Sequence, residues 1–94
     1  MRKVIWNLEK AITLSNNDLR NGVGFEDCLA AIEAGRILDD LPNPSPQYPH
    51  QRILILNIDN YAYAAPYVQE DGVAFLKTVF PSRKYTAKYL RASI

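Results

Sequence analysis

Cationic and phenolic side chains near the end of the chain are the residues best suited to chemistry. Residues 72–94 contain five cations and no acidic side chain, whereas residues 1–71 contain six cations and all ten acidic side chains. The net charges of the two segments are therefore +5 and −4. Such a separation is typical of a surface that binds phosphate groups or acidic side chains. The five cations are Lys77, Arg83, Lys84, Lys88 and Arg91.

Each of these cations has a structural explanation beside the functional one. Lys77 interrupts a largely apolar strand face, where a lysine either deters edge-to-edge aggregation or points at a phosphate. Arg52 begins a strand and could form a rim salt bridge or hold a phosphate. Arg83 and Lys84 lie in the first turn of a predicted helix, where cations oppose the helix dipole. This unfavourable placement slightly favours a functional role for Arg83 and Lys84.

Several kinds of catalytic and cofactor site are absent from the sequence. The chain has one histidine, His50, and one cysteine, Cys28, which are too few for a zinc site of these residues. It has no Walker-type phosphate loop, and Gly22 and Gly24 lack the rest of a dinucleotide-binding motif. We therefore expect no metal ion and no organic cofactor.

The composition indicates a small globular protein, with residues 1–94 in one domain. Of the 94 residues, 48% are hydrophobic and 22% are charged, as in chains that fold around their own core. No apolar run approaches the roughly 18 residues that span a bilayer, so we expect no membrane segment. A lone cysteine cannot form an internal disulfide, which favours a reducing compartment and a cytoplasmic location.

The hydrophobic pattern predicts an α+β fold. We expect a short strand at residues 4–6, a first helix that ends near Arg20, and a second helix with a buried face at helical spacing. That face contains Phe25, Cys28, Leu29 and Ile32. Strands at 52–58, 61–68 and 73–80 are separated by tight turns, and a short helix capped by Ser82 follows. The predicted order is β-α-α-β-β-β-α: a small, mostly antiparallel sheet with two N-terminal helices on one face and a short C-terminal helix.

Prolines and tyrosines refine this prediction. Residues 36–41 can add a strand before residues 42–50, whose four prolines predict an extended loop. Pro66 lacks an amide donor, which predicts a bulge or a locally unpaired edge. Tyr85 and Tyr89 are one helical turn apart, so we expect them to dock the last helix on the sheet, with base stacking as the alternative.

Four segments carry a resemblance to a known family. They are "NGVGFEDCLAAIEAGRILDDL", "YPHQRILIL", "YAYAAPYV" and "FLKTVFPSRKYTAKYL". Together they resemble the BrnT-type toxins of bacterial type II toxin–antitoxin modules, relatives of the RelE-type ribonucleases, and the last segment is the most specific. The chain departs from the family's Lys-His-Gly before the second helix, where it has Arg20, Asn21 and Gly22.

The resemblance implies a RelE-like fold and a metal-independent endoribonuclease that inhibits translation. Such an enzyme promotes attack of the RNA 2′-hydroxyl on the adjacent phosphate. On this hypothesis Arg52, Lys77 and Arg83 hold the phosphate. The candidates for proton transfer are His50, Tyr48 and Lys77, and the RNA backbone is guided by Lys84, Lys88 and Arg91. The partners would be RNA and a cognate antitoxin, often of ribbon-helix-helix type, with DNA contacted only through their complex.

Two alternatives do not require catalysis. The chain could be a partner- or nucleic-acid-binding module that acts only in complex with an adjacent antitoxin, whose acidic segment would meet the basic end of the chain. It could also be a simple RNA- or DNA-binding domain. The predicted last helix is short, and the strands lack the repeated exposed aromatic residues of an RNA-recognition sheet, which disfavours the second alternative.

Overall fold

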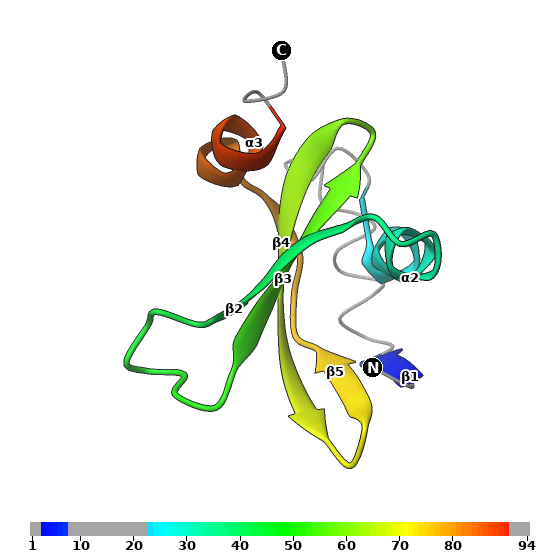
Figure 1. The fold of residues 1–94 in the computed structure, drawn as a ribbon. Coiled ribbons are helices and arrows are strands. Elements are labelled where there is room, and N and C mark those ends of the chain that lie inside the picture. The colour runs from blue at the N-terminus through cyan, green and yellow to red at the C-terminus, as the bar shows by residue number, and fades with distance from the viewer. Residues whose placement is uncertain (1–2, 8–22, 91–94) are drawn as a thin grey trace.

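The computed structural model of the chain describes residues 3–7 and 23–90 (Figure 1). These residues form six strands and two helices, which are β1 (Lys3–Trp6), α2 (Phe25–Glu33), β2 (Ile37–Pro42), β3 (Arg52–Ile58), β4 (Tyr61–Glu70), β5 (Val73–Leu76), β6 (Phe80–Pro81) and α3 (Arg83–Tyr89). The strands make one sheet in the order β1-β5-β4-β3-β2, and β6 pairs with β4. Strand β1 runs parallel to β5, and the other neighbours are antiparallel.

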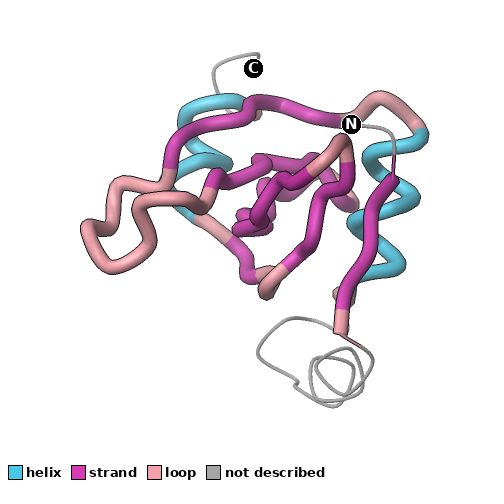
Figure 2. The backbone as a smooth tube through the Cα atoms, turned by 90° about the horizontal axis from the view of Figure 1, so that it is seen from below, coloured by secondary structure: helices cyan, strands magenta, loops and turns pink. Residues whose placement is uncertain are grey.

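The predicted fold, a RelE-like order of β-α-α-β-β-β-α, is wrong. The sheet is mixed and has six strands, and only one of the two described helices, α2, precedes the central strands. The two described helices do not share a face: α2 and α3 lie on opposite sides of the sheet (Figure 2). The first predicted helix, ending near Arg20, lies outside the described residues. Hydrophobic spacing located individual elements but could not show which sheet face each helix covers.

Helix α2 confirms the second predicted helix. The backbone N–H of Gly24 donates to Oδ2 of Asp27 at 2.8 Å, which fixes the first turn, where an acidic side chain also suits the helix dipole. Of its predicted buried face, Phe25 and Cys28 are buried against the sheet, whereas Leu29 and Ile32 are only half-buried, and Ala31 is buried in addition. After the helix, Gly35 has a φ of +74°, a conformation that glycine adopts without steric cost.

Alternation of side chains along the central strands produces two cores. Leu54 and Leu56 of β3 pack on the α2 face with Tyr67 of β4. Ile53 and Ile55 point to the opposite face, where they form a second core with Ala62 and Ala64. The partly buried aromatic rings of α3 cover this core. Because both faces of β3 are apolar, this strand is central, as its continuous Ile and Leu run predicts.

Two tight hairpins connect β3, β4 and β5, as predicted. Asp59 and Asn60 have φ values of +54° and +62°, and Asp71 and Gly72 have +51° and +81°. Two consecutive left-handed residues match the right-handed twist of the flanking strands. The β3–β4 register runs without a bulge from Arg52 opposite Tyr67 to Ile58 opposite Tyr61.

The strand predicted at residues 73–80 is interrupted at residues 77–79. β4 pairs with β5 through Tyr67–Glu70 and with β6 through Tyr63 and Ala64, so Pro66 lies between the two pairings. The Pro66 carbonyl accepts from the N–H of Lys77 at 2.8 Å. Proline has no N–H to donate, and here none is needed, because the residue lies between the two strand pairings. The locally unpaired edge predicted at this proline is therefore confirmed. Because of this interruption, Val79 points into the core on the α2 face, whereas Lys77 is exposed.

Neither of the two helices in the described part of the chain is long and apolar enough to cross a membrane.

Candidate functional site

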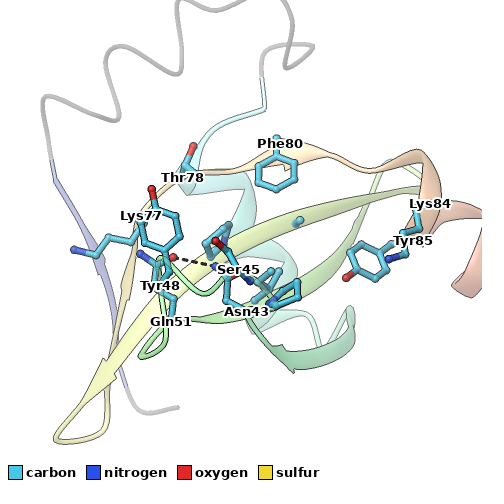
Figure 3. A pocket seen from close by; sticks show the side chains of 13 residues that line it. Asn43, Ser45, Tyr48, Gln51, Lys77, Thr78, Phe80, Lys84 and Tyr85 are labelled. Carbon is cyan, nitrogen blue, oxygen red and sulfur yellow. Dashed lines mark hydrogen bonds between the residues drawn. The ribbon is translucent and has the colours of Figure 1, made fainter.

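A cleft of about 600 Å³ lies on the α3 side of the sheet (Figure 3). Ile53, Ala64 and Pro66 of the central strands form its floor. Three segments far apart in the sequence form its walls: the proline-rich loop, the interruption between β5 and β6, and the start of α3. The wall residues are Asn43, Pro44, Ser45, Tyr48 and Gln51; Lys77, Thr78 and Phe80; and Lys84 and Tyr85.

The charged residues that line the cleft are both cations, Lys77 and Lys84. They lie toward opposite ends of it (Figure 3). Each ammonium group lies over an aromatic ring: Nζ of Lys77 is 4.4 Å from the Phe75 ring centre, and Nζ of Lys84 is 5.4 Å from that of Tyr85. Neither forms an ion pair with another described residue. Both charges are therefore available to an anionic ligand.

Internal hydrogen bonds hold the proline-rich loop in one shape. The N–H of Asn43 donates to the carbonyl of Gln51 at 3.0 Å, and the N–H of Tyr48 donates to that of Ser45 at 3.1 Å. The Asn43 side chain accepts from the N–H of Ser45 at 2.9 Å. Since the prolines also fix φ, little conformational freedom remains to be lost on binding. The loop places Tyr48, which is 48% exposed, at the rim of the cleft.

Helix α3 is held to the sheet by its cap and by a buried threonine. Oγ of Ser82 accepts from the N–H of Tyr85 at 3.1 Å, which confirms the predicted N-cap. Oγ1 of Thr86 accepts from the N–H of Ala62 at 2.9 Å and donates to the carbonyl of Ser82 at 2.7 Å. These bonds fix the first turn of the helix, and with it Lys84, relative to the cleft floor.

The structure brings three of the predicted site residues together at the cleft, Tyr48, Lys77 and Lys84. His50, Arg83 and Lys88 are exposed but do not line it. Nζ of Lys88 lies instead 5.3 Å from the centre of the Tyr89 ring. Arg91 lies outside the described residues.

Arg52 lies away from the cleft, in a polar cluster on the other sheet face. Its neighbour Ile53 forms the cleft floor, and successive strand residues point to opposite faces. Nε of Arg52 donates to Oδ1 of Asp40 at 3.0 Å, and the Tyr67 hydroxyl donates to Oδ2 at 2.7 Å. The bond to Asp40 raises the pKa of Arg52, and burial with the same carboxylate raises that of Tyr67 to about 12. The rim salt bridge considered for Arg52 is thus present, and the structure separates this residue from Lys77.

Most of the polar lining is not predicted from the sequence. Asn43, Ser45, Gln51 and Thr78 all line the cleft, as does the apolar Phe80, and none of the five is a predicted site residue. A signal for two of them exists in the alternation of proline with Asn and Ser at residues 42–46, because Asn and Ser form side-chain turns that fix a loop. Nothing local to the sequence indicates that Gln51 and Thr78 lie at one site.

A second, smaller hollow of about 320 Å³ adjoins Lys77. Its apolar residues are Ile5, Val68, Val73 and Phe75, and Glu70 and Asp71 lie at its border. Lys77 lines both hollows, with its ammonium over the Phe75 ring.

No family model, curated protein or solved structure matches the chain.

Proposed function

We propose that the protein binds single-stranded RNA in the cleft and cleaves it, as the toxin of a type II toxin–antitoxin pair that acts in the cytoplasm. The observation that carries the proposal is the composition of the cleft: two unpaired lysines, the rings of Tyr48 and Tyr85, and no acidic side chain among the described residues of the lining. Ammonium groups attract phosphates, and aromatic rings stack on bases, which is how proteins hold single strands.

The size of the cleft suits a single strand. A volume of about 600 Å³ accommodates a ligand of nucleotide size. A duplex would keep its bases stacked inside, whereas a single strand can turn a base onto the floor of Ile53, Ala64 and Pro66. The lysines at the two ends then lie where the phosphates on either side of that base would pass.

The chemistry requires proton transfer at two oxygens. The 2′-hydroxyl loses its proton and attacks the phosphorus, and the 5′-oxygen leaves with a proton, which gives a 2′,3′-cyclic phosphate and a 5′-hydroxyl. Lys77 stabilises the charge that develops on the phosphate, Tyr48 at the rim donates a proton to the leaving 5′-oxygen, and water takes the proton of the 2′-hydroxyl. Tyr48→Phe keeps the ring and removes the hydroxyl, so it should lower the cleavage rate by about 10²-fold or more and change RNA affinity little.

The sequence supports the same assignment. The segment with the most specific resemblance to BrnT-type toxins, "FLKTVFPSRKYTAKYL", contributes Lys77, Thr78 and Phe80 to one wall and Lys84 and Tyr85 to another.

The proposal is tested with the purified full chain, a labelled single-stranded RNA and EDTA. Wild type should bind the RNA and cut it without added metal. Lys77→Ala and Lys84→Ala should each weaken binding about tenfold and slow cleavage further, with the circular dichroism spectrum unchanged. Arg36→Ala is the matched control, because Arg36 is an exposed cation away from the cleft. Absence of RNA binding, or full activity in both lysine variants, would contradict the proposal.

A second candidate function is a module that acts through a partner, favoured by the smaller hollow. Its apolar residues and the 41%-exposed Phe80 offer apolar area beside the basic cleft. The antitoxin encoded by an adjacent gene would place an apolar side chain there and acidic side chains near Lys77. Co-purification of the two products, with loss of the complex in Val73→Asp but no loss of RNA cleavage, would identify this surface. A chain that binds the antitoxin but never cuts RNA would favour the module over the enzyme.

A further inference from the structure

Two carboxamides in the cleft wall are locked in a defined orientation. Oδ1 of Asn43 accepts from the N–H of Ser45 at 2.9 Å, so the other end of this amide, Nδ2, must act as a donor. Nδ2 donates to Oε1 of Gln51 at 3.3 Å (dashed line in Figure 3). This bond turns Oε1 of Gln51 toward Asn43 and leaves the Nε2 amino group as the end directed elsewhere.

The other uncharged polar groups of the cleft can also donate. Oγ of Ser45 accepts from the N–H of Gln47 at 3.3 Å, which leaves its own proton available. The Thr78 hydroxyl lines the same cleft, and the ammonium groups of Lys77 and Lys84 are donors only. Gln51 through Nε2, Ser45 through its hydroxyl, and the two lysines can thus all donate hydrogen bonds in the cleft.

From this arrangement we infer that Gln51 recognises the base held in the cleft and selects keto bases, guanine and uracil, over adenine and cytosine. The inference rests on the proposed RNA-binding function. At purine position 6 and pyrimidine position 4, guanine and uracil present a carbonyl oxygen to a donor, whereas adenine and cytosine present an amino group. Glutamine commonly binds adenine through both ends of its amide, and in that mode Oε1 faces the base, whereas here Oε1 is turned toward Asn43.

Gln51 lines the cleft together with apolar residues on which a base can lie. Ile53, Ala64 and Pro66 form an apolar floor on which a planar ring can lie, and Gln51 stands in the wall beside it (Figure 3). Asn43 acts indirectly, as a positioning residue. It determines which end of the Gln51 amide the base meets.

Two substitutions reverse this pattern in different ways. Gln51→Glu keeps an oxygen for Asn43 and replaces the Nε2 donor with an acceptor. Asn43→Asp keeps the bond from Ser45, but its second oxygen can only accept. Gln51 must then turn its amino group toward residue 43 and present Oε1 to the base. Both variants should shift preference toward amino bases. Gln47→Glu is the matched control, because it adds the same charge to an exposed position of the same loop outside the cleft lining.

The experiment measures dissociation constants of the full chain for oligonucleotides of U, A or C and for oligo-U with one central G, by fluorescence anisotropy. Wild type should bind the U and G sequences about tenfold more tightly than the A and C sequences. Gln51→Glu and Asn43→Asp should each lower that ratio at least tenfold. Gln47→Glu should weaken all four affinities alike and leave the ratio unchanged.

The outcomes distinguish failure of this inference from failure of the proposed RNA-binding function on which it rests. Wild type that binds none of the oligonucleotides contradicts the proposed function and the inference together. Wild type that binds all four equally, or a base preference that neither substitution alters, overturns the recognition by Gln51 and leaves RNA binding standing.

Discussion

The hydroxyl of Tyr89, in the last turn of α3, donates a hydrogen bond to Oδ2 of Asp39 in β2, a residue 50 positions earlier in the chain. The bond crosses the sheet face that holds the cleft and ties the C-terminal helix to the edge strand. The Tyr85 ring stacks on Tyr89 with 6.1 Å between centres, so the same contact supports a residue of the cleft wall.

Tyr89→Phe should destabilise the protein at neutral pH, because Asp39 loses the donor that holds α3 against β2. Urea unfolding followed by circular dichroism measures the effect. Tyr48→Phe, which removes an exposed hydroxyl from another tyrosine, should leave the unfolding midpoint unchanged. Equal midpoints for the two variants would show that the Tyr89 bond contributes nothing.

The same pair predicts a pH dependence. The hydrogen bond from Tyr89 lowers the pKa of Asp39 below its ordinary 3.8, so its contribution to stability is present above that pH and is lost as the pH falls further. The bond to Asp39 raises the pKa of Tyr89 from 10.0 to about 12, so its contribution is full below pH 10 and is lost between pH 10 and about 12. The difference in unfolding midpoint between wild type and Tyr89→Phe should be constant from about pH 5 to 9 and shrink outside that range. A difference that grows in acid would contradict the assignment.

Thr86→Val should cost about 2 kcal/mol of unfolding free energy, because it leaves the fully buried N–H of Ala62 without its acceptor. Thr86→Ser keeps the hydroxyl and removes one methyl group, so it should cost about 1 kcal/mol. Chemical denaturation of both variants measures the two values. The reverse ranking would mean that packing of the methyl group, and not the hydrogen bond, holds α3 in place.

RNA affinity should depend on salt through the cleft lysines. For single strands each phosphate contact contributes about 0.7 to the slope of log affinity against log salt concentration. Lys84→Ala should therefore reduce the slope by about 0.7, and Arg36→Ala should not change it. Titrations between 50 and 300 mM salt give the slopes, and an unchanged slope in Lys84→Ala would place the phosphate elsewhere.

Cys28 should be chemically inert in the folded protein. Its side chain is fully buried on α2, and burial, assisted by the Asp27 carboxylate, raises the pKa of its thiol to about 12. Iodoacetamide at pH 8 should modify it at least about 100-fold more slowly than in urea-unfolded chain, at a rate set by opening of α2. Mass spectrometry follows the reaction. Rapid modification of native protein would show that α2 opens readily.

Local patterns predicted the elements that depend on local physics. The helix at Phe25, the turn at Asp59 and the cap at Ser82 each follow from the residues within a few positions, and all three are present. Pro66 was also informative, because the absence of an N–H is a property of one residue.

The order of the sheet and the composition of the cleft depend on contacts that spacing does not encode. The pairing of Lys3 with Val73 makes the sheet mixed, and nothing near either residue indicates it. Arg52 and Lys77 looked equivalent as strand cations. Side-chain alternation places them on different faces, because Arg52 precedes Ile53 of the α3-face core and Lys77 follows Leu76 of the α2-face core.

The parallel pairing of β1 with β5 also affects how the chain can be made. Synthesis releases β1 first, yet residues 3–6 meet their partners only when residues 73–76 have appeared. The β3–β4 hairpin, by contrast, closes across two residues and can form at once. On the ribosome, therefore, the β3–β4 hairpin forms early, whereas β1 stays unpaired until β5 has been synthesised. The proline-rich wall of the cleft then emerges well before Lys77 and Lys84, so a nascent chain lacks the cationic part of its site until both lysines have been synthesised.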